Sequence, residues 1–211
     1  GPVRPGGGSS DDLIRNQLRC LTSIDEGVAK MLGALAETSA LDNTVVVFTS
    51  DNGYFWGEHG LGDKRFAYEE SIRIPLFVRY PRLARAGSSV DAMALNIDIA
   101  PTLLDLAGVK PPASIQGRSL TNLLQGKKNG WRTSFLSEYF LEEKYPRTPT
   151  WQTARTDRWK YVRCPQLEGM DELYDLKADP YEMKNLIADP AAGKTLGEMK
   201  AELARLLKES A

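Results

Sequence analysis

The chain has 211 residues, of which 42% are hydrophobic and 26% charged, and its 27 basic and 28 acidic residues give a formal net charge of −1. This length allows one large domain or one domain with a small appendage, and the composition is typical of a globular protein. The charge balance excludes a basic footprint for nucleic acid or an anionic membrane, and no apolar run approaches the roughly 20 residues of a membrane span.

The first ten residues and the two cysteines give little functional information. Residues 1–10 are rich in glycine, proline and serine and lack the apolar core of a signal peptide. We therefore expect a flexible lead-in or a tag remnant. Cys20 and Cys164 lie far apart and form no metal-ligand spacing. We expect buried or half-buried thiols, and a disulfide between them stays open.

The segment from Asp11 to Glu37 is predicted to form one long helix. Its apolar residues recur on one stripe at alternating spacings of three and four, and two acids at its start favour the positive end of the helix dipole. The stripe consists of Ile14, Leu18, Leu21, Val28, Leu32 and Leu35. Asp25 also falls on it. We expect this carboxylate to be buried and hydrogen-bonded, because an unpaired buried acid would be costly.

An α/β arrangement is predicted for the next hundred residues. The run Thr44–Asp51 is apolar on both faces, which favours a central parallel strand covered by helices. A long glycine-rich loop, residues 51–70, leads to a second strand at Arg73–Pro81. Asn96–Val109 is predicted to be a helix that ends near a glycine, and a short helix follows in "RSLTNLLQG".

The pattern changes after about residue 130. Short strands separated by turn residues are typical of an antiparallel meander, with a tight hairpin near residues 156–158 and a last helix at about Leu196–Leu207. We therefore expect two parts beyond the lead-in. Residues 11–130 belong to an α/β layer, and residues 131–211 form a small antiparallel sheet with a terminal helix.

The loop "TSDNGYFWGEHGLGDK" gathers groups that carry chemistry. Asp51 and Asn52 offer hard oxygen ligands suited to Ca²⁺ or Mg²⁺, at the strand end where open α/β sheets bind ligands. Lys64 could hold an anion or stabilise a leaving oxygen, and His59 could donate a proton. Taken singly, these residues also fit a turn, a surface lysine and a solvated histidine. Their combination favours a functional site.

The loop by itself cannot form a complete metal site. Two ligands cannot form the shell of about six to eight oxygens that Ca²⁺ requires, and no second acidic cluster is clearly placed to help. Further ligands must therefore come from elsewhere.

The stretch "NTVVVFTSDNGYFWGEHGLGDKRFAYEESIRIPLFVRYP" resembles the C-terminal metal-and-substrate loop of type I sulfatases, in the alkaline phosphatase superfamily. The family pattern is a strand, S-D-[NH]-G, a variable stretch, G-[ED]-H-G, a lysine, and a strand containing R-x-P-L. The likeness extends over about residues 11 to 208, including the helix that carries Asp25. It implies part of an alkaline-phosphatase-like α/β layer, followed by the small antiparallel sheet with its terminal helix.

The resemblance also implies roles for the loop residues. Asp51 and Asn52 would be the second pair of protein ligands to one divalent cation, usually Ca²⁺ with Mg²⁺ as the alternative. Asn52 stands where some relatives carry histidine. Tyr54, Phe55 and Trp56 lie in the variable stretch, where lining of a substrate pocket, core packing and simple loop filling stay open. Lys64 would bind the sulfate and the bridging oxygen of the departing alcohol, and His59 belongs to the same catalytic motif. The implied substrate is a sulfated small molecule or carbohydrate, with no nucleic acid partner.

One family feature is absent from these residues. The family's nucleophile is a formylglycine made from Cys or Ser in a C/S-x-P/A-x-R motif, and this sequence contains no such motif. We therefore expect the C-terminal portion of a sulfatase that pairs with a missing N-terminal half and is inactive alone. The alternatives are a phosphonate monoester hydrolase or phosphodiesterase, and a non-catalytic module. The resemblance implies a periplasmic, secreted or lysosomal setting if the natural precursor carries a signal peptide.

Overall fold

The computed structural model describes residues 10–210, so most of the predicted lead-in, residues 1–9, lies outside the described part. The described residues form two compact units. Among the described residues, the N-terminal unit contains residues 10–63 together with Arg73–Asn129. The C-terminal unit contains Lys64–Ile72 together with residues 130–210. Within residues 10–210, no helix combines the length and the apolar character that crossing a membrane requires.

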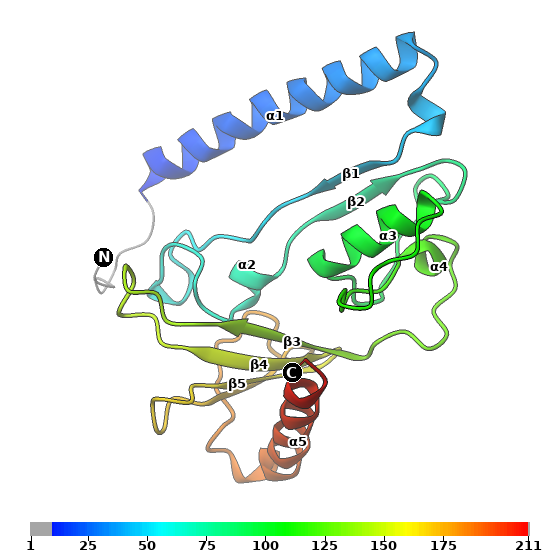
Figure 1. The fold of residues 1–211 in the computed structure, drawn as a ribbon. Helices are drawn as coiled ribbons and strands as arrows, with labels where there is room; N and C mark the ends of the chain where they lie inside the picture. Colours follow the sequence, from blue (N-terminus) through cyan, green and yellow to red (C-terminus); the bar gives the residue numbers. More distant parts are fainter. Residues whose placement is uncertain (1–9, 211) are drawn as a thin grey trace. The chain divides into compact units, whose positions relative to one another are not determined.

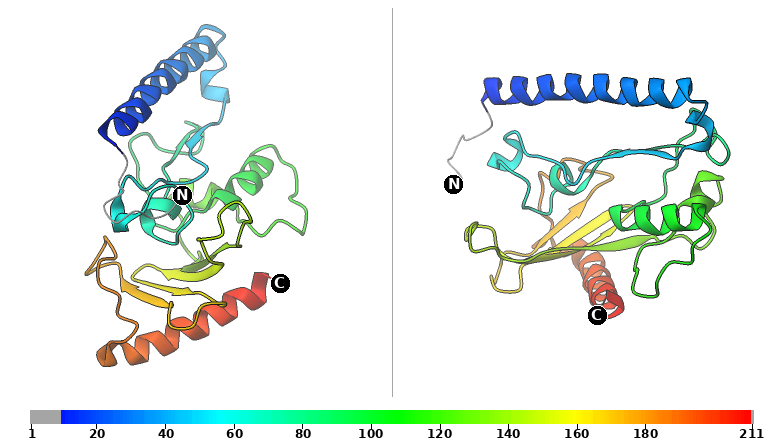
Figure 2. Two further views of the ribbon diagram at one scale, coloured as in Figure 1. Left: turned by 90° about the vertical axis from the view of Figure 1, so that its left-hand side faces the viewer. Right: turned by 45° about the horizontal axis from the view of Figure 1, so that its top comes forward.

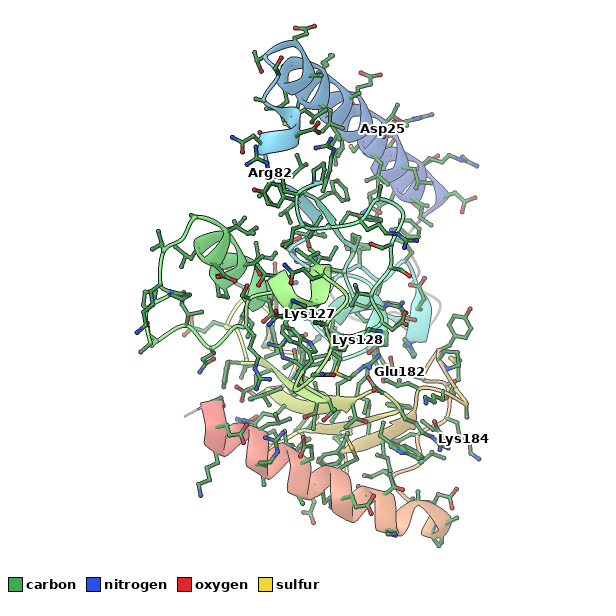
Figure 3. The ribbon with its side chains drawn as sticks, turned by 90° about the vertical axis from the view of Figure 1, so that its right-hand side faces the viewer. Asp25, Arg82, Lys127, Lys128, Glu182 and Lys184 are labelled. Atoms are coloured by element: carbon green, nitrogen blue, oxygen red, sulfur yellow. The ribbon has the colours of Figure 1, made fainter. Side chains whose placement is uncertain are left out.

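Helix α1 (Asp11–Glu37) confirms the long helix predicted from the sequence (Figure 1). The Ser10 hydroxyl caps it by accepting a hydrogen bond from the Leu13 amide at 3.2 Å. None of the helix residues is buried, and Asp25 (Figure 3) is exposed. The predicted burial of Asp25 is therefore wrong. A period of 3.6 predicts which face of a helix is apolar, but burial also needs a covering surface, which the described residues do not provide.

The two-stranded sheet of the N-terminal unit pairs β1 (Val46–Thr49) with β2 (Leu76–Arg79). The 3-10 helix η1 (Leu41–Asn43) leads into β1. The strands run antiparallel, so the predicted parallel central strand is wrong. Phe48 and Phe77 lie opposite each other and are 39% and 66% exposed. An apolar run predicts that a strand can be buried on both faces, but the direction of pairing depends on which strand lies beside it.

Both helices predicted for the rest of this unit are present, although the first begins as a 3-10 helix and ends at Leu106 rather than Val109. The 3-10 helix η3 (Asn96–Asp98) continues into α3 (Ile99–Leu106), and α4 (Thr121–Leu124) comes later. Gly108 lies just beyond α3 with φ 71°, a left-handed conformation that glycine adopts readily at helix ends.

Buried polar contacts join these two helices. The fully buried carboxylate of Asp98 accepts hydrogen bonds from the Leu95 and Arg118 amides, both at 2.8 Å. Thr102 donates to the Asp98 carbonyl at 2.6 Å and accepts from the Leu120 amide at 2.8 Å. Polar ties of this kind fix the segment before α4 against α3.

The C-terminal unit contains the predicted antiparallel meander. Its four strands pair in chain order, and the β4–β5 hairpin turns at residues 157–158 as predicted. The strands are β3 (Ser134–Tyr139), β4 (Trp151–Thr156), β5 (Trp159–Arg163) and β6 (Glu172–Asp175).

Helix α5 (Gly193–Ser210) packs on this sheet (Figure 2). It follows the 3-10 helix η4 (Pro190–Ala192) and is longer at both ends than the predicted Leu196–Leu207. The shared core consists of Ala154, Tyr161, Leu173, Ala192, Met199 and Leu203. This unit therefore buries its own apolar face.

The segment Lys64–Ile72, which we call the Lys64 segment, also belongs to the C-terminal unit. It ends in the short helix α2 (Glu69–Ile72) and packs Ala67 into a second apolar cluster with Trp151 and Val162. Cys164, half-buried beside that cluster, is a free thiol, and so is Cys20. Cys20 is exposed, which corrects the expectation that both thiols would be at least half-buried.

Candidate functional site

Asp51 and Asn52 lie directly after β1, where the chain turns away from the strand. The Asn52 amide donates to Asp51 Oδ1 at 3.0 Å, and the Ser50 hydroxyl donates to the Asn52 carbonyl at 2.8 Å. Asn52 Nδ2 donates to the Gly53 carbonyl at 2.7 Å. These local hydrogen bonds, typical of Asp and Asn in turns, fix the conformation of the predicted ligand pair.

This pair fits a divalent cation in its donor chemistry. The amide nitrogen of Asn52 is only a hydrogen-bond donor, so Oδ1 is the atom that Asn52 can offer to a cation. The hydrogen bond from Nδ2 to the Gly53 carbonyl holds the amide group in one orientation. Asp51 is exposed and contributes a carboxylate, so the two residues supply hard oxygen donors of the kind that Ca²⁺ and Mg²⁺ prefer. Within residues 10–210, no group of three or more His, Cys, Asp or Glu side chains is placed to hold a metal ion. By itself, such a pair could supply only part of the coordination shell that a divalent cation requires.

His59 lies in the 3-10 helix η2 (Glu58–Gly60), inside a tightly folded loop. Its φ of 55° is left-handed, which is uncommon for a residue with a side chain. The ring of His59 meets the ring of Phe55 edge to face, with centroids 6.3 Å apart. Phe55 is fully buried, and its amide donates to the Asp63 carbonyl at 2.8 Å. The imidazole therefore packs beside a buried phenyl ring.

The other two aromatic residues of the loop remain partly exposed. Tyr54 is 38% exposed and Trp56 is 36% exposed. The indole N–H of Trp56 donates to Gln17 Oε1 on α1 at 2.5 Å. Of the three uses that the sequence left open, core packing applies to Phe55 and not to its neighbours.

Lys64 is the first residue of the C-terminal unit and is half-buried. Its carbonyl accepts a hydrogen bond from the Ser71 hydroxyl at 2.5 Å. The next residue, Arg65, lies 3.3 Å from Glu142 and stacks its guanidinium 3.2 Å from the centre of the Tyr145 ring. The predicted site residues thus divide between the units, with Asp51, Asn52 and His59 in one and Lys64 in the other.

A buried ion cluster in the C-terminal unit was not predicted from the sequence. Lys160 on β5 is fully buried, and its ammonium lies 3.0 Å from Glu69 and 2.7 Å from Glu182. A lysine between Trp159 and Tyr161, within a strand of otherwise apolar inward positions, is the signal that could have indicated it.

Two family models match the chain. One is described as "N-sulphoglucosamine sulphohydrolase, C-terminal" and matches residues 57–209. The other is described as "Sulfatase" and matches residues 4–109. Each covers half of the 211 residues or more.

Individual proteins are similar over most of the chain. The N-acetylglucosamine-6-O-sulfatase of Bacteroides thetaiotaomicron is 38% identical over 93% of this chain. The solved structure of BT4656 in complex with its substrate D-glucosamine-2-N,6-O-disulfate is 37% identical over 90% of this chain, with a TM-score of 0.86. The phosphonate monoester hydrolase of Agrobacterium radiobacter is 28% identical over 90% of this chain, with a TM-score of 0.82.

The likeness covers only part of each relative. The chain spans 35% of the Bacteroides sulfatase, 39% of the BT4656 chain and 40% of the Agrobacterium chain. The structural likeness over this part confirms the alkaline-phosphatase-like α/β fold with an added antiparallel sheet that the sequence predicted. From the two family models and these relatives together, we conclude that the chain belongs to the sulfatase family.

Proposed function

We propose that the protein containing this chain is a sulfuric ester hydrolase that acts on a sulfated carbohydrate. The observation that carries the proposal is the fixed Asp51–Asn52 turn at the end of β1, followed along the chain by the anchored Lys64. Family membership supports the reaction class. In this proposal, Asp51 and Asn52 bind a divalent cation, Ca²⁺ or alternatively Mg²⁺, and Lys64 binds the sulfate group.

The residues of this chain would act through charge and hydrogen bonding. A bound divalent cation supplies positive charge that polarises the sulfate oxygens. The Lys64 ammonium stabilises the negative charge that develops on the bridging oxygen as the S–O bond breaks. His59 donates a hydrogen bond or a proton near the same group. The nucleophile, a formylglycine, would come from outside these 211 residues, since they contain no C/S-x-P/A-x-R segment.

The names of the relatives support an amino sugar as the substrate. One relative is an N-acetylglucosamine-6-O-sulfatase, and BT4656 was solved with a sulfated glucosamine. Both are at least 37% identical to this chain over nine-tenths of its length. We therefore propose a sulfated glucosamine residue as the substrate class.

The test measures sulfate release from two substrates by the protein expressed from the natural reading frame that contains this chain. We expect release of sulfate from N-acetylglucosamine-6-sulfate and from 4-nitrophenyl sulfate, and loss of both activities after EDTA treatment with recovery on adding Ca²⁺. The 211-residue chain alone should release no sulfate, because it lacks the nucleophile. Sulfate release by the 211-residue chain, or activity that survives EDTA, would contradict the proposal.

A second candidate is a phosphonate monoester hydrolase or phosphodiesterase. The Agrobacterium hydrolase favours it, with a TM-score of 0.82. Its sequence identity of 28% is lower than that of the sulfatase relatives. Turnover of a phosphonate monoester or a phosphodiester at a higher kcat/KM than the sulfate esters would favour this candidate.

A non-catalytic module is less well supported. Such a module should cover its own apolar faces, whereas Phe77 is 66% exposed, and Leu18 and Leu21 on the stripe of α1 are 47% and 53% exposed. These open faces favour a chain that works as part of a larger folded enzyme.

A further inference from the structure

The C-terminal unit holds the Lys64 segment by its backbone. The Ser71 hydroxyl donates to the Lys64 carbonyl at 2.5 Å. The indole N–H of Trp151 donates to the Arg65 carbonyl at 2.8 Å, and the ammonium of Lys160 donates to the Ala67 carbonyl at 2.9 Å. Two of these three donors come from strands that lie more than 80 positions further along the chain. The strands therefore determine the path of the backbone that carries Lys64.

Lys160 makes several of these attachments at once. Its Nζ donates to the Ala67 carbonyl and lies 3.0 Å from Glu69 Oε1, so it contacts the Lys64 segment at two positions. It also lies 2.7 Å from Glu182 Oε1, and Glu182 Oε2 accepts from the Glu69 amide at 2.8 Å. Arg155 on β4 contacts the second oxygen of Glu69 at 3.2 Å. Lys160, Glu182 and Arg155 thus each contact the segment directly.

The cluster has equal numbers of positive and negative charges, as expected for a rigid attachment of the Lys64 segment. Two cations, Lys160 and Arg155, meet two carboxylates, Glu69 and Glu182. Burial opposes ionisation of Glu69, but Lys160 and Arg155 together lower the pKa of this carboxyl. Burial raises the pKa of Glu182 although Lys160 acts in the other direction. Removing one partner would leave an uncompensated buried charge, so the arrangement tolerates little displacement.

Glu182 shows that the backbone is adapted to this cluster. The residue lies between β6 and α5 and has φ 53°, a left-handed conformation that is unfavourable for a residue with a side chain (Figure 3). It is nevertheless almost fully buried, with both carboxylate oxygens directed at Lys160 and the Glu69 amide. The contacts of the Glu182 carboxylate therefore offset the cost of its left-handed backbone conformation.

We propose that Lys160 is a positioning residue for Lys64: it holds the backbone of the Lys64 segment so that the Lys64 ammonium meets the sulfate group. This inference rests on the proposed function, in which Lys64 binds sulfate. Lys160 itself contacts protein groups and is fully buried, so it is not a catalytic residue. Substituting Lys160 would lower turnover by displacing Lys64.

The first test measures order and does not depend on activity. Hydrogen exchange is followed in the 211-residue chain for wild type and Lys160→Met. We expect the amides of residues 65–72 to exchange at least about tenfold faster in the variant, while the amides of α5 stay protected. Arg158→Gln is the matched control, because Arg158 precedes the same strand and pairs with Asp175, away from the segment. Unchanged exchange at residues 65–72 would overturn the proposal.

A second variant covers the case in which Lys160→Met unfolds the unit. Lys160→Met combined with Glu182→Gln removes one cation and one carboxylate together, leaving the Arg155–Glu69 pair. The same local increase in exchange is expected with α5 still protected. If this balanced variant loses protection throughout the unit, Lys160 supports the whole fold rather than the segment, and the proposal is wrong.

The second test is a double-mutant cycle on sulfate ester turnover, using the chain in its natural reading frame. We expect Lys160→Met to lower kcat/KM roughly tenfold in the presence of Lys64 and less than about twofold in a Lys64→Ala background. Equal losses in both backgrounds would indicate a general structural role and overturn the proposal. If the wild-type protein turns over no sulfate ester, the proposed function fails, while the exchange result still reports separately on how the segment is held.

Discussion

The two units of the chain differ in how they bury apolar surface. In the C-terminal unit, α5 covers one face of the four-stranded sheet, and six buried residues form a closed core. In the N-terminal unit, α1 extends over 27 residues without burying one of them, and the two-stranded sheet exposes Phe77. The C-terminal unit has the organisation of a self-sufficient fold. The N-terminal unit has the elements of a larger α/β layer, but the described residues lack the elements that would pack on its apolar faces.

This difference bears on the proposed chemistry. The sulfate-binding candidate, Lys64, is attached to the unit that packs well on its own. The cation-binding candidates, Asp51 and Asn52, belong to the unit with open apolar faces. We therefore expect the anion-binding part to be ordered in this chain and the cation-binding part to depend more on whatever covers its unit.

The largest stability effect is expected in the core of the C-terminal unit. Leu203 on α5 is buried against Tyr161, Leu173 and Met199. Leu203→Ala should lower the free energy of unfolding by about 2–5 kcal/mol, because it removes apolar contact and leaves a cavity. Urea denaturation followed by circular dichroism measures this loss. A loss below about 1 kcal/mol would mean that this unit is no better packed than its neighbour.

A smaller loss of stability is expected when the buried carboxylate of Asp98 in the N-terminal unit is replaced. Asp98→Asn replaces one of the two buried acceptor oxygens, so the Leu95 or Arg118 amide loses its partner. We expect a loss of about 1–3 kcal/mol in the unfolding of this unit. Asp105→Asn is the matched control at an exposed site and should cost less. Equal losses would argue that burial is unimportant at this position.

The pH dependence of the C-terminal unit provides a third test. Glu202 on α5 has a pKa lowered to about 2, chiefly by the hydrogen bond from Arg205. Unfolding returns this carboxyl to its ordinary value of 4.5, so the stabilisation is fully present above that pH and is lost as the pH falls through about 2. Denaturation at a series of pH values should show this decline. Glu202→Gln should flatten the curve over this range, and an unchanged slope would contradict the assignment.

The smallest effect is expected on the open face of α1. Leu18 lies on the apolar stripe but remains 47% exposed. Leu18→Ala should change the free energy of unfolding by less than about 0.5 kcal/mol in this chain, since little apolar surface is lost and alanine favours helix. Denaturation alongside Leu203→Ala gives the contrast directly. A loss comparable to that of Leu203→Ala would show that the stripe is covered in solution.

Sequence reasoning succeeded where the signal is local. The amphipathic period and the acidic start predicted α1 with its observed bounds, and the turn residues predicted the hairpin between β4 and β5. These features depend on residues a few positions apart. The same is true of the Asp51–Asn52 turn, whose hydrogen bonds join neighbouring residues.

Sequence reasoning failed where the outcome depends on distant parts of the chain. The period of α1 marked Asp25 as inward, but no described surface covers it. The apolar run of β1 did not reveal that its partner is the antiparallel strand β2, in which Arg79 pairs with Val46. The hydrogen bond from Lys160 to Ala67 spans 93 positions. A single lysine in a predicted strand does not indicate which distant residue it contacts.

The central claim is that Lys64 binds the sulfate group. Its most direct test is the kcat/KM for sulfate ester hydrolysis by a Lys64 variant of the protein expressed from the natural reading frame. Lys64→Ala is compared with Lys110→Ala, which removes an exposed lysine of the N-terminal unit. We predict a loss of about 10²- to 10³-fold for Lys64→Ala, because the charge on the leaving oxygen loses its counterion, and a change below about twofold for Lys110→Ala. Wild-type turnover by Lys64→Ala would contradict the account.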